Sequence, residues 1–248
     1  MKVLFILLAC LSGGVSAQTV APFVMFEPLE RGQAGAVLDI GNPGTEPLRL
    51  RVSAASFTYE DGGLVVVEPG GAHDLTPYLQ YAPLELTVAP GATRQVRLAA
   101  RIPPSQVKGE LRAVIFVQPV NSAMNRGIGV ASRIGATFYA QPSDSAPELR
   151  ALSARWRKDV GLLLGVRNAG TASAQAGVRW QLRRAGAVVA SGESLPYTVV
   201  ALSERALPLG ETGLRPGEYT LELTLETYQG LERLDRSEAS LSFTIPAD

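Results

Sequence analysis

The sequence has little of the side chains on which most enzyme chemistry depends. It contains one cysteine and one histidine in 248 residues. Zinc sites use several such ligands, and a hydrolase triad needs a histidine beside its nucleophile, so these counts argue against both. No Gly-x-Ser-x-Gly elbow, phosphate loop or dinucleotide fingerprint is present. An esterase or a glycosidase would have to use His73 or a pair of carboxylates, and we expect no enzyme.

The lone histidine belongs to the one grouping that looks like a metal cluster. His73 and Asp74 lie in a loop rich in glycine and proline, with Glu60 and Asp61 upstream. Metal sites need three or four converging ligands, whereas a loop histidine in polar surroundings is ordinary surface. We therefore expect no metal and no cofactor. An oxygen-only calcium site between domains stays open, although no spacing demands one.

Net charge and aromatic side chains are also scarce. The chain has 23 basic and 23 acidic residues, and 6% of its residues are aromatic. Nucleic-acid binders usually carry a basic excess, and single-strand binders need aromatic stacking platforms, so no nucleic-acid partner is expected. In contrast, 46% of the residues are hydrophobic and 19% are charged. That balance indicates an ordered chain with an ample core.

No apolar run is long enough to cross a bilayer. The longest is Val3 to Leu11, which follows Met1-Lys2 and precedes the small residues Val15-Ser16-Ala17. This pattern predicts a secretory signal peptide over 1–17, cleaved before Gln18, and hence the periplasm with no membrane span after cleavage. A lipoprotein signal that uses Cys10 is the minor alternative. Cleavage would remove the only cysteine and leave a mature chain without disulfides.

Period-two alternation dominates the rest of the chain. Apolar and polar residues alternate in the stretches 48–54, 178–183, 219–226 and 241–245. Such alternation is typical of half-buried strands. Further strands are predicted at 37–42, 64–67, 84–88, 95–99, 111–117, 127–139 and 162–168. Because no stretch shows a helical stripe over three turns, we predict an all-β fold of two Ig-like antiparallel β-sandwich domains in tandem.

A short polar segment divides the two predicted domains. It covers 143–147 and is bracketed by prolines, as linkers often are. The predicted domains therefore span 18–142 and 148–248. A faint internal repeat supports the division, since Asn42-Pro43-Gly44-Thr45 and Asn168-Ala169-Gly170-Thr171 each follow a predicted strand. Pro90-Gly91 and Pro216-Gly217 follow these at equal distances, which suggests related topologies or an accidental reuse of turns.

Three stretches of the first domain follow a pattern known from one protein family. Residues 36–42 form a predicted strand that ends in Asn. Residues 86–98 contain a Pro-Gly turn and a Val-Arg-Leu strand after it, and residues 109–117 and 133–142, with Phe138-Tyr139, contain two further strands. In these stretches the domain resembles the periplasmic pilus-assembly chaperones, which have two Ig-like domains: they look like the family's early strand, its turn with the following strand, and its last two strands. The resemblance covers 22–142, which makes 18–142 the chaperone-type domain. The second domain matches only in length and class.

The resemblance implies a binding function based on strand addition. Chaperones of this family capture pilus subunits that lack their last strand, and they fill the open groove with a strand of their own. The corresponding strand here is 127–139, and its groove-facing side would carry Ile128, Val130, Ser132 and Ile134. The same parity suits packing in this domain's own core. We favour the core for Ile134 and Phe138, whereas Ile128 and Val130 fit both roles.

One feature of the family is missing from the sequence. The family anchors the subunit's terminal carboxylate between two basic residues, through charge-assisted hydrogen bonds. The matching positions fall near Phe26 and Ala136, and neither residue is basic. Arg97 and Arg133 are the nearby alternatives, although each also suits an exposed strand face. This departure leaves carboxylate anchoring, and the involvement of an usher, open.

Two classes of function therefore remain. The first is a periplasmic chaperone-like protein whose partner is a pilus or surface-fibre subunit, with an outer-membrane usher left open as a second partner. The second is a structural or adhesive cell-envelope protein built of the same Ig-like modules without a chaperone cycle. The missing basic pair favours the second, and the matching stretches across the first domain favour the first.

Overall fold

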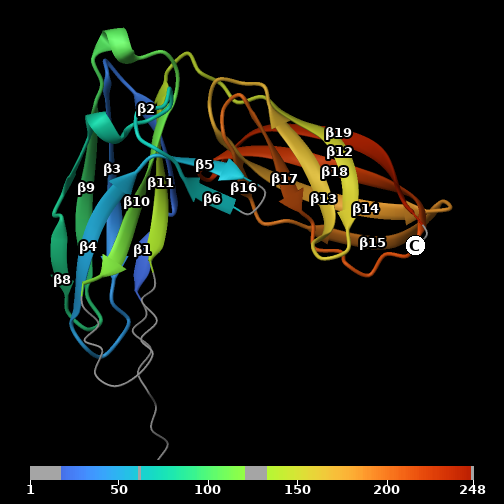
Figure 1. Ribbon diagram of the computed structural model, residues 1–248, viewed down its shortest axis with the longest axis horizontal. Coiled ribbons are helices and arrows are strands. Elements are labelled where there is room, and N and C mark those ends of the chain that lie inside the picture. The colour runs from blue at the N-terminus through green and yellow to red at the C-terminus, as the bar shows by residue number, and fades with distance from the viewer. Residues whose placement is uncertain (1–17, 61–62, 121–132, 247–248) are drawn as a thin grey trace, which may run out of the picture.

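The computed structural model describes residues 18–60, 63–120 and 133–246, which fold into two β-sandwiches set at an angle (Figure 1). The signal peptide predicted over 1–17 lies outside these residues. In the first domain one sheet has the order β1 (Thr19–Ala21), β3 (Gln33–Gly41), β9 (Thr93–Arg101), β7 (Leu79–Ala82). The other has the order β2 (Val24–Leu29), β11 (Ile134–Pro142), β10 (Leu111–Pro119), β4 (Leu48–Ala55), β8 (Glu85–Val88).

Smaller elements complete the first domain. A two-stranded hairpin of β5 (Phe57–Glu60) and β6 (Gly63–Val66) belongs to neither sheet. Two 3-10 turns, η1 (Thr76–Tyr78) and η2 (Pro104–Gln106), lie in the connections. The core between the sheets is built from alternate side chains, among them Leu38, Leu50, Val96, Ile115 and Phe138. The alternation read from the sequence is therefore the inside–outside alternation of this sandwich.

The strands β10 and β11 are buried on both faces. Along β10, Ala113, Ile115 and Val117 enter the sandwich core, while Val114 and Phe116 belong to a second apolar cluster on the opposite face. A strand covered on both sides reads as a continuous apolar run, as residues 113–117 do. Unlike the predicted antiparallel arrangement, β2 runs parallel to β11.

The second domain is a smaller sandwich. One sheet has the order β12 (Leu149–Arg157), β13 (Gly161–Asn168), β17 (Ser203–Pro208). The other has the order β15 (Ala187–Glu193), β14 (Ala174–Arg184), β18 (Gly217–Gln229), β19 (Glu232–Ile245), and β16 (Tyr197–Val199) also pairs with β14. Its core contains Leu164, Val178, Trp180, Leu221 and Leu225. The chain between β11 and β12 covers residues 143–148.

The asparagine that directly follows β3 organises the turn after this strand. Asn42 is buried, and its Nδ2 donates to the carbonyl oxygens of Glu46 and Val88 at 2.8 and 2.9 Å. Its Oδ1 accepts from the N–H of Gly44 at 3.0 Å, which closes an Asx turn. The side chain therefore joins the end of β3 to the end of β8.

The asparagine that ends β13 makes the same set of contacts. Asn168 is fully buried, and its Nδ2 donates to the carbonyl oxygens of Ala172 and Val199 at 2.9 and 3.0 Å. Its Oδ1 accepts from the N–H of Gly170 at 3.0 Å. Because both asparagines bond at the same offsets within the turn, this half of the internal repeat reflects related local structure in the two domains.

The other half of the repeat is coincidental. Val88, whose carbonyl accepts from Asn42, lies three residues before Gly91, whose φ is +69°. Val199, whose carbonyl accepts from Asn168, lies three residues before Leu202, whose φ is +56°. Leu202 is therefore the structural counterpart of Gly91. Gly217 instead pairs with Ile245 at the start of β18. The equal spacing of the two Pro-Gly pairs was thus a misleading signal.

A buried carboxylate stabilises the sheet of the second domain that contains β14, β18 and β19. Glu226 accepts hydrogen bonds from the hydroxyl of Tyr228 at 2.6 Å, from Arg179 at 2.7 Å and from Arg233 at 3.1 Å. The Tyr228 bond and the two guanidinium groups lower the pKa of Glu226 from 4.5 to about 2. The folded state therefore favours the charged form of this side chain.

We expect a pH-dependent loss of stability at this site. A carboxyl whose pKa is lower in the folded state adds stability that is complete above its ordinary pKa and disappears as the pH falls toward 2. In thermal unfolding, the Tm of Glu226→Gln should therefore lie well below the Tm of the parent at neutral pH. The difference between the two Tm values should shrink as the pH falls through the acid range. Glu238→Gln, at an exposed ion pair with Arg236, should leave Tm nearly unchanged. A Glu226→Gln deficit that does not vary with pH would contradict this account.

Candidate functional site

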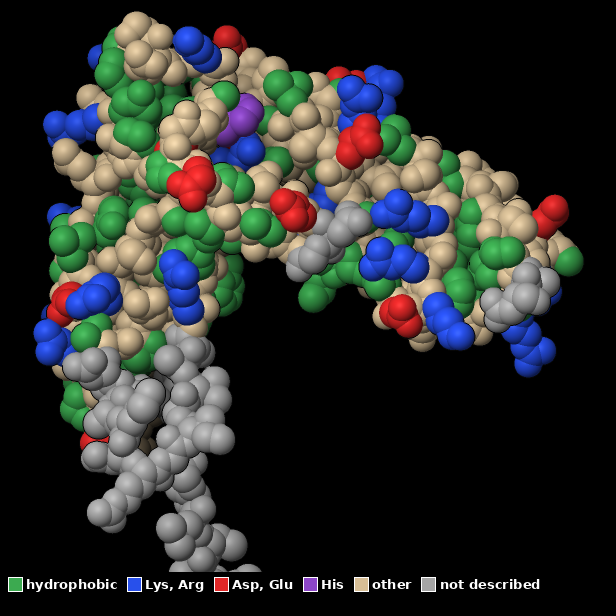
Figure 2. Space-filling view, viewed as in Figure 1, with side chains coloured by type: hydrophobic (Ala, Val, Ile, Leu, Met, Phe, Trp, Pro, Cys, Tyr) green, Lys and Arg blue, Asp and Glu red, His purple; other side chains and the backbone are tan. Residues whose placement is uncertain are grey.

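The candidate site is the hollow between the two domains, which Figure 2 shows below their junction. The face of the β10–β11 sheet that points away from the first-domain core carries a separate apolar cluster, which we call the cleft cluster. Its buried members are Phe57, Val114, Phe116, Tyr139 and Val200, and its partly buried members are Val24, Phe26, Ala55, Tyr59 and Leu64. Val200 comes from the second domain, so the cluster joins the two sandwiches.

Aromatic contacts hold the cleft cluster together. The rings of Phe26 and Tyr139 stack with centroids 4.9 Å apart, and Phe57 meets Tyr139 edge-on at 5.9 Å. Both geometries are favourable for aromatic pairs. Burial raises the pKa of the Tyr139 phenol well above 10, so the hydroxyl stays protonated. The buried rings therefore pack against one another, and the cleft cluster reaches solvent only through partly buried members such as Phe26 and Tyr59.

The two positions expected to match the family's basic pair differ in orientation. Phe26 lies in the cleft cluster and stacks on Tyr139. Ala136, in contrast, is fully buried in the first-domain core and does not face the hollow. Its neighbour Thr137 has the parity of Tyr139 and so points to the cleft side. Of these two neighbours it is therefore Thr137 that faces the cleft, and it is not basic either.

The two alternative anchor residues lie on different sheets. Arg97 is exposed on β9, between Val37 and Ala82 on the neighbouring strands, and that sheet packs on the far side of the first-domain core. Arg133 precedes β11, and its guanidinium carbon lies 3.3 Å from the centroid of the Phe116 ring. The structure therefore brings Arg133 to the cleft cluster and leaves Arg97 away from it.

Two cations that the sequence did not indicate also reach the cleft cluster. Arg112 is buried, with its Nη1 3.5 Å from Glu110 and its Nε 3.4 Å from the carbonyl oxygen of Phe57. Arg205 comes from β17 of the second domain, and its guanidinium carbon lies 4.1 Å from the centroid of the Tyr59 ring. No periodicity or motif in a single sequence marks either residue, because their placement depends on how the two domains meet.

The start of β11 has an open strand edge. Pairing with β10 begins at Ile134, whereas pairing with β2 begins only at Thr137. The N–H of Thr137 donates to Phe23 at 2.9 Å, so the backbone groups of Gly135, two residues earlier, point to the same side. Within the described part of the chain no strand pairs with 134–136 on that side. The residues Ile128, Val130 and Ser132 directly precede this edge and lie outside the described residues.

Side chains on one face of β11 pack in the chain's own core. Phe138 and Ala136 are fully buried there, and Ile134 is partly buried against the same core. The core assignment is therefore confirmed for Phe138. Ile134 packs against the same core, but part of its side chain stays exposed.

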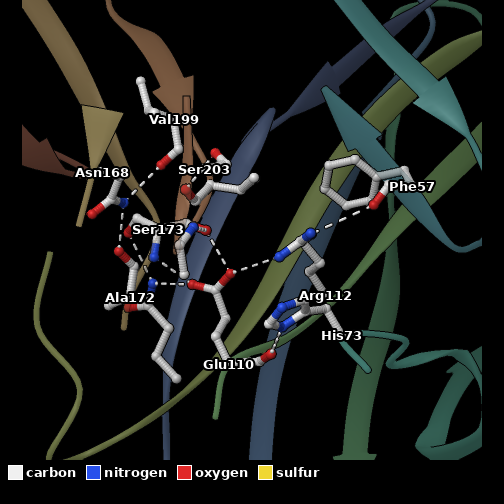
Figure 3. Close-up of polar contacts among 12 residues, drawn as sticks. Phe57, His73, Glu110, Arg112, Asn168, Ala172, Ser173, Val199 and Ser203 are labelled. Atoms are coloured by element: carbon white, nitrogen blue, oxygen red, sulfur yellow. Dashed lines mark hydrogen bonds and ion pairs between the residues drawn. The ribbon is translucent and has the colours of Figure 1, made fainter. Parts of the chain in front are cut away.

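A buried polar group fastens the two domains beside the hollow. The carboxylate of Glu110 accepts from the backbone N–H and the hydroxyl of Ser173, both at 2.5 Å, and from Nε2 of Gln141 at 2.9 Å. Figure 3 shows Glu110 between Ser173 and Arg112. Gln229 donates to Gln141 at 2.9 Å and to the carbonyl of Ser173 at 3.0 Å. We call Glu110, Gln141, Ser173 and Gln229 the interdomain knot.

His73 and Asp74 have structural contacts next to the knot. The Nδ1 of His73 lies 2.9 Å from the carbonyl oxygen of Glu110 (Figure 3). Asp74 is buried and accepts from the backbone N–H groups of Gly70 and Thr76. Over the described ranges, no three His, Cys, Asp or Glu side chains gather closely enough to hold a metal ion. Nor do those ranges contain a helix with the length and hydrophobicity of a membrane span.

Comparison with known proteins finds similarity in structure alone. No family model matches the sequence, and no curated protein matches it. Among solved structures, the YadV chaperone is 12% identical, with a TM-score of 0.55 over 90% of this chain and 99% of that chain. The complex of the CsuC chaperone with the CsuE tip subunit, from Csu pili of Acinetobacter baumannii, gives 12% and 0.53 over 90% and 98%.

A further match is the Salmonella enterica SafA pilin in complex with the SafB chaperone, at 12% identity and a TM-score of 0.52 over 93% of this chain and 97% of that chain. These alignments span both sandwiches, so they also cover the second domain, for which the sequence offered little. The predicted all-β tandem is confirmed, and the chain has the two-domain fold of the pilus-assembly chaperones.

Proposed function

We propose that this chain is a non-enzymatic periplasmic chaperone that binds incomplete Ig-like pilus or surface-fibre subunits by adding a strand to them. The observation that carries the proposal is the open edge at 134–136, which borders the apolar cleft cluster. An unpaired edge offers backbone hydrogen bonds to a second chain, and adjacent apolar side chains supply the fit. Structures of the same fold that hold a pilin or a tip subunit support it.

The donated strand would continue β11 toward its amino-terminal side. Side chains with the parity of Ile134 fill this domain's own core, so an extended continuation would present Ser132, Val130 and Ile128 on that same side. The two larger residues would be the main groove-filling groups. Ile134 would mark the point where packing inside the chaperone gives way to packing in the subunit.

Arg133 is the residue we propose as the anchor for a terminal carboxylate. It is exposed, and its guanidinium stacks on Phe116 at the cleft cluster. Among the described residues its donor groups have no hydrogen-bond partner. A charge-assisted bond from such a group contributes about 1.5–3 kcal/mol. Arg97 offers the same charge without this position, which makes it a matched control.

Coexpression tests both proposals. The chain would be produced in a bacterial periplasm together with an Ig-like pilus subunit that lacks its last strand. We expect a one-to-one complex by size-exclusion chromatography with light scattering. Arg133→Ala should weaken that complex about tenfold, and Arg97→Ala should leave it unchanged. If subunits remain aggregated beside a free chaperone, the proposed function is wrong. Equal effects of the two substitutions would exclude only the anchor.

A further inference from the structure

The β5–β6 hairpin extends from the first domain toward the second. In Figure 1 it reaches toward β16 and β17. Tyr59, paired with Leu64 in this hairpin, meets Arg205 of β17, whose guanidinium carbon lies 4.1 Å from the ring centroid. This contact therefore joins two sandwiches through a projecting element that belongs to neither large sheet.

Arg205 is held for this contact by its own domain. Its Nη1 donates to the carbonyl oxygen of Thr198 at 2.5 Å, and its guanidinium carbon lies 5.6 Å from the ring centroid of Tyr197. Across residues 18–60, 63–120 and 133–246, it forms no ion pair with a carboxylate. The ring faces of Tyr59 and Tyr197 therefore supply favourable cation–π contacts to this half-buried guanidinium.

The contact is separate from the interdomain knot. The knot uses Glu110 at the start of β10 and Gln141 at the end of β11, directly before the connection between the domains. The Tyr59–Arg205 pair instead joins β5 of the hairpin to β17. A single attachment near a connecting segment allows one domain to swing about it, whereas a second attachment elsewhere restricts that motion.

We propose that Tyr59 and Arg205 form a clasp that limits how far the hollow between the domains opens. In this arrangement one domain rotates relative to the other about the interdomain knot, and the clasp limits that rotation. Val200, which packs in the cleft cluster near the hairpin, adds apolar contact on the same side. The inference goes beyond the proposed function, because it concerns the angle between the domains whether or not a subunit binds.

The side chains allow closely matched variants. Tyr59→Phe keeps the ring and should keep the clasp, whereas Tyr59→Ala removes it. Arg205→Ala removes the cation, and Arg205→Lys keeps the charge but loses the planar group that stacks on a ring. Neither residue belongs to the knot or to either sandwich core. We therefore expect both domains to remain folded in all four variants.

Single-molecule energy transfer can measure the opening. The chain from Gln18 to Asp248, which contains no native cysteine, would carry Val37→Cys and Val188→Cys and be labelled at these two exposed sites, one on each domain. The parent and Tyr59→Phe should show one narrow distance distribution. Arg205→Ala and Tyr59→Ala should roughly double its width, and Arg205→Lys should fall between.

Two results would overturn the clasp. One is a distribution in Arg205→Ala that matches the parent while circular dichroism and Tm show a folded protein. The other is an equal broadening in Tyr59→Phe, which would mean that the ring face is not the contact that matters. If Arg205→Ala does not fold, the comparison of Arg205→Lys with Tyr59→Phe still decides, because only the lysine variant should broaden.

Discussion

Replacing Ile128 and Val130 together with aspartate should abolish capture of an incomplete pilus subunit. In the proposed complex both side chains enter an apolar groove, where an unpaired carboxylate costs several kcal/mol. Two such groups should weaken binding by at least about 100-fold, which corresponds to about 2.8 kcal/mol. The measurement is the amount of subunit recovered with the chaperone after coexpression in the periplasm.

The control uses two valines on other surfaces. Val37 lies on the outer face of the first domain and Val188 on an edge strand of the second, with 43% and 49% of their surface exposed. Val37→Asp with Val188→Asp adds the same charge to the same number of apolar sites and should leave recovery unchanged. If the Ile128→Asp, Val130→Asp variant retains its subunit as well as this control does, strand addition by the segment before β11 is excluded.

Replacing Glu110 with alanine should produce the largest loss of stability. The carboxylate is fully buried, and its removal leaves the N–H and hydroxyl of Ser173 and the amide of Gln141 without their acceptor. It also leaves the buried Arg112 without its nearest acidic group. Buried polar groups that lose a partner cost about 1–3 kcal/mol each, so a total of about 3–5 kcal/mol is expected.

Scanning calorimetry would detect this loss as a fall in Tm of about 10 °C. Glu148→Ala is the matched control, because Glu148 is an exposed carboxylate paired with the exposed Arg150. Its loss should cost no more than about 0.5 kcal/mol. Glu110→Gln, which keeps one acceptor oxygen, should fall between the two. A Glu110→Ala protein that melts together with Glu148→Ala would show that the knot does not stabilise the molecule.

Strands that alternate in polarity or form a continuous apolar run could be predicted from the sequence, whereas β2 could not. Residues 48–54 and 219–226 alternate cleanly and form parts of β4 and β18. The stretch Val24–Leu29 has no alternation and contains Pro28, yet it forms β2 because β11 supplies a parallel partner. That pairing depends on tertiary contact, which no local pattern records.

The candidate site was only partly predictable for the same reason. The open edge lies within the predicted strand 127–139, and Arg133 was named as a residue of that strand. Arg205, Tyr59 and Glu110 became visible only once the domains were placed together. In the sequence Glu110 is an ordinary charged residue before an apolar run, and only its burial against Ser173 reveals its role.

The parallel pairing of β2 with β11 also constrains the order of folding. Val24 pairs with Thr137, so a strand near one end of the first domain cannot complete its ladder until the last strand of that domain has been made. Native topology dominated by such remote pairings closes large loops and folds slowly. During that delay the early strand exposes Met25 and Leu29, which are core residues in the finished fold. Until β11 is in place these apolar residues favour aggregation, which is the same hazard that the proposed function would suppress in pilus subunits.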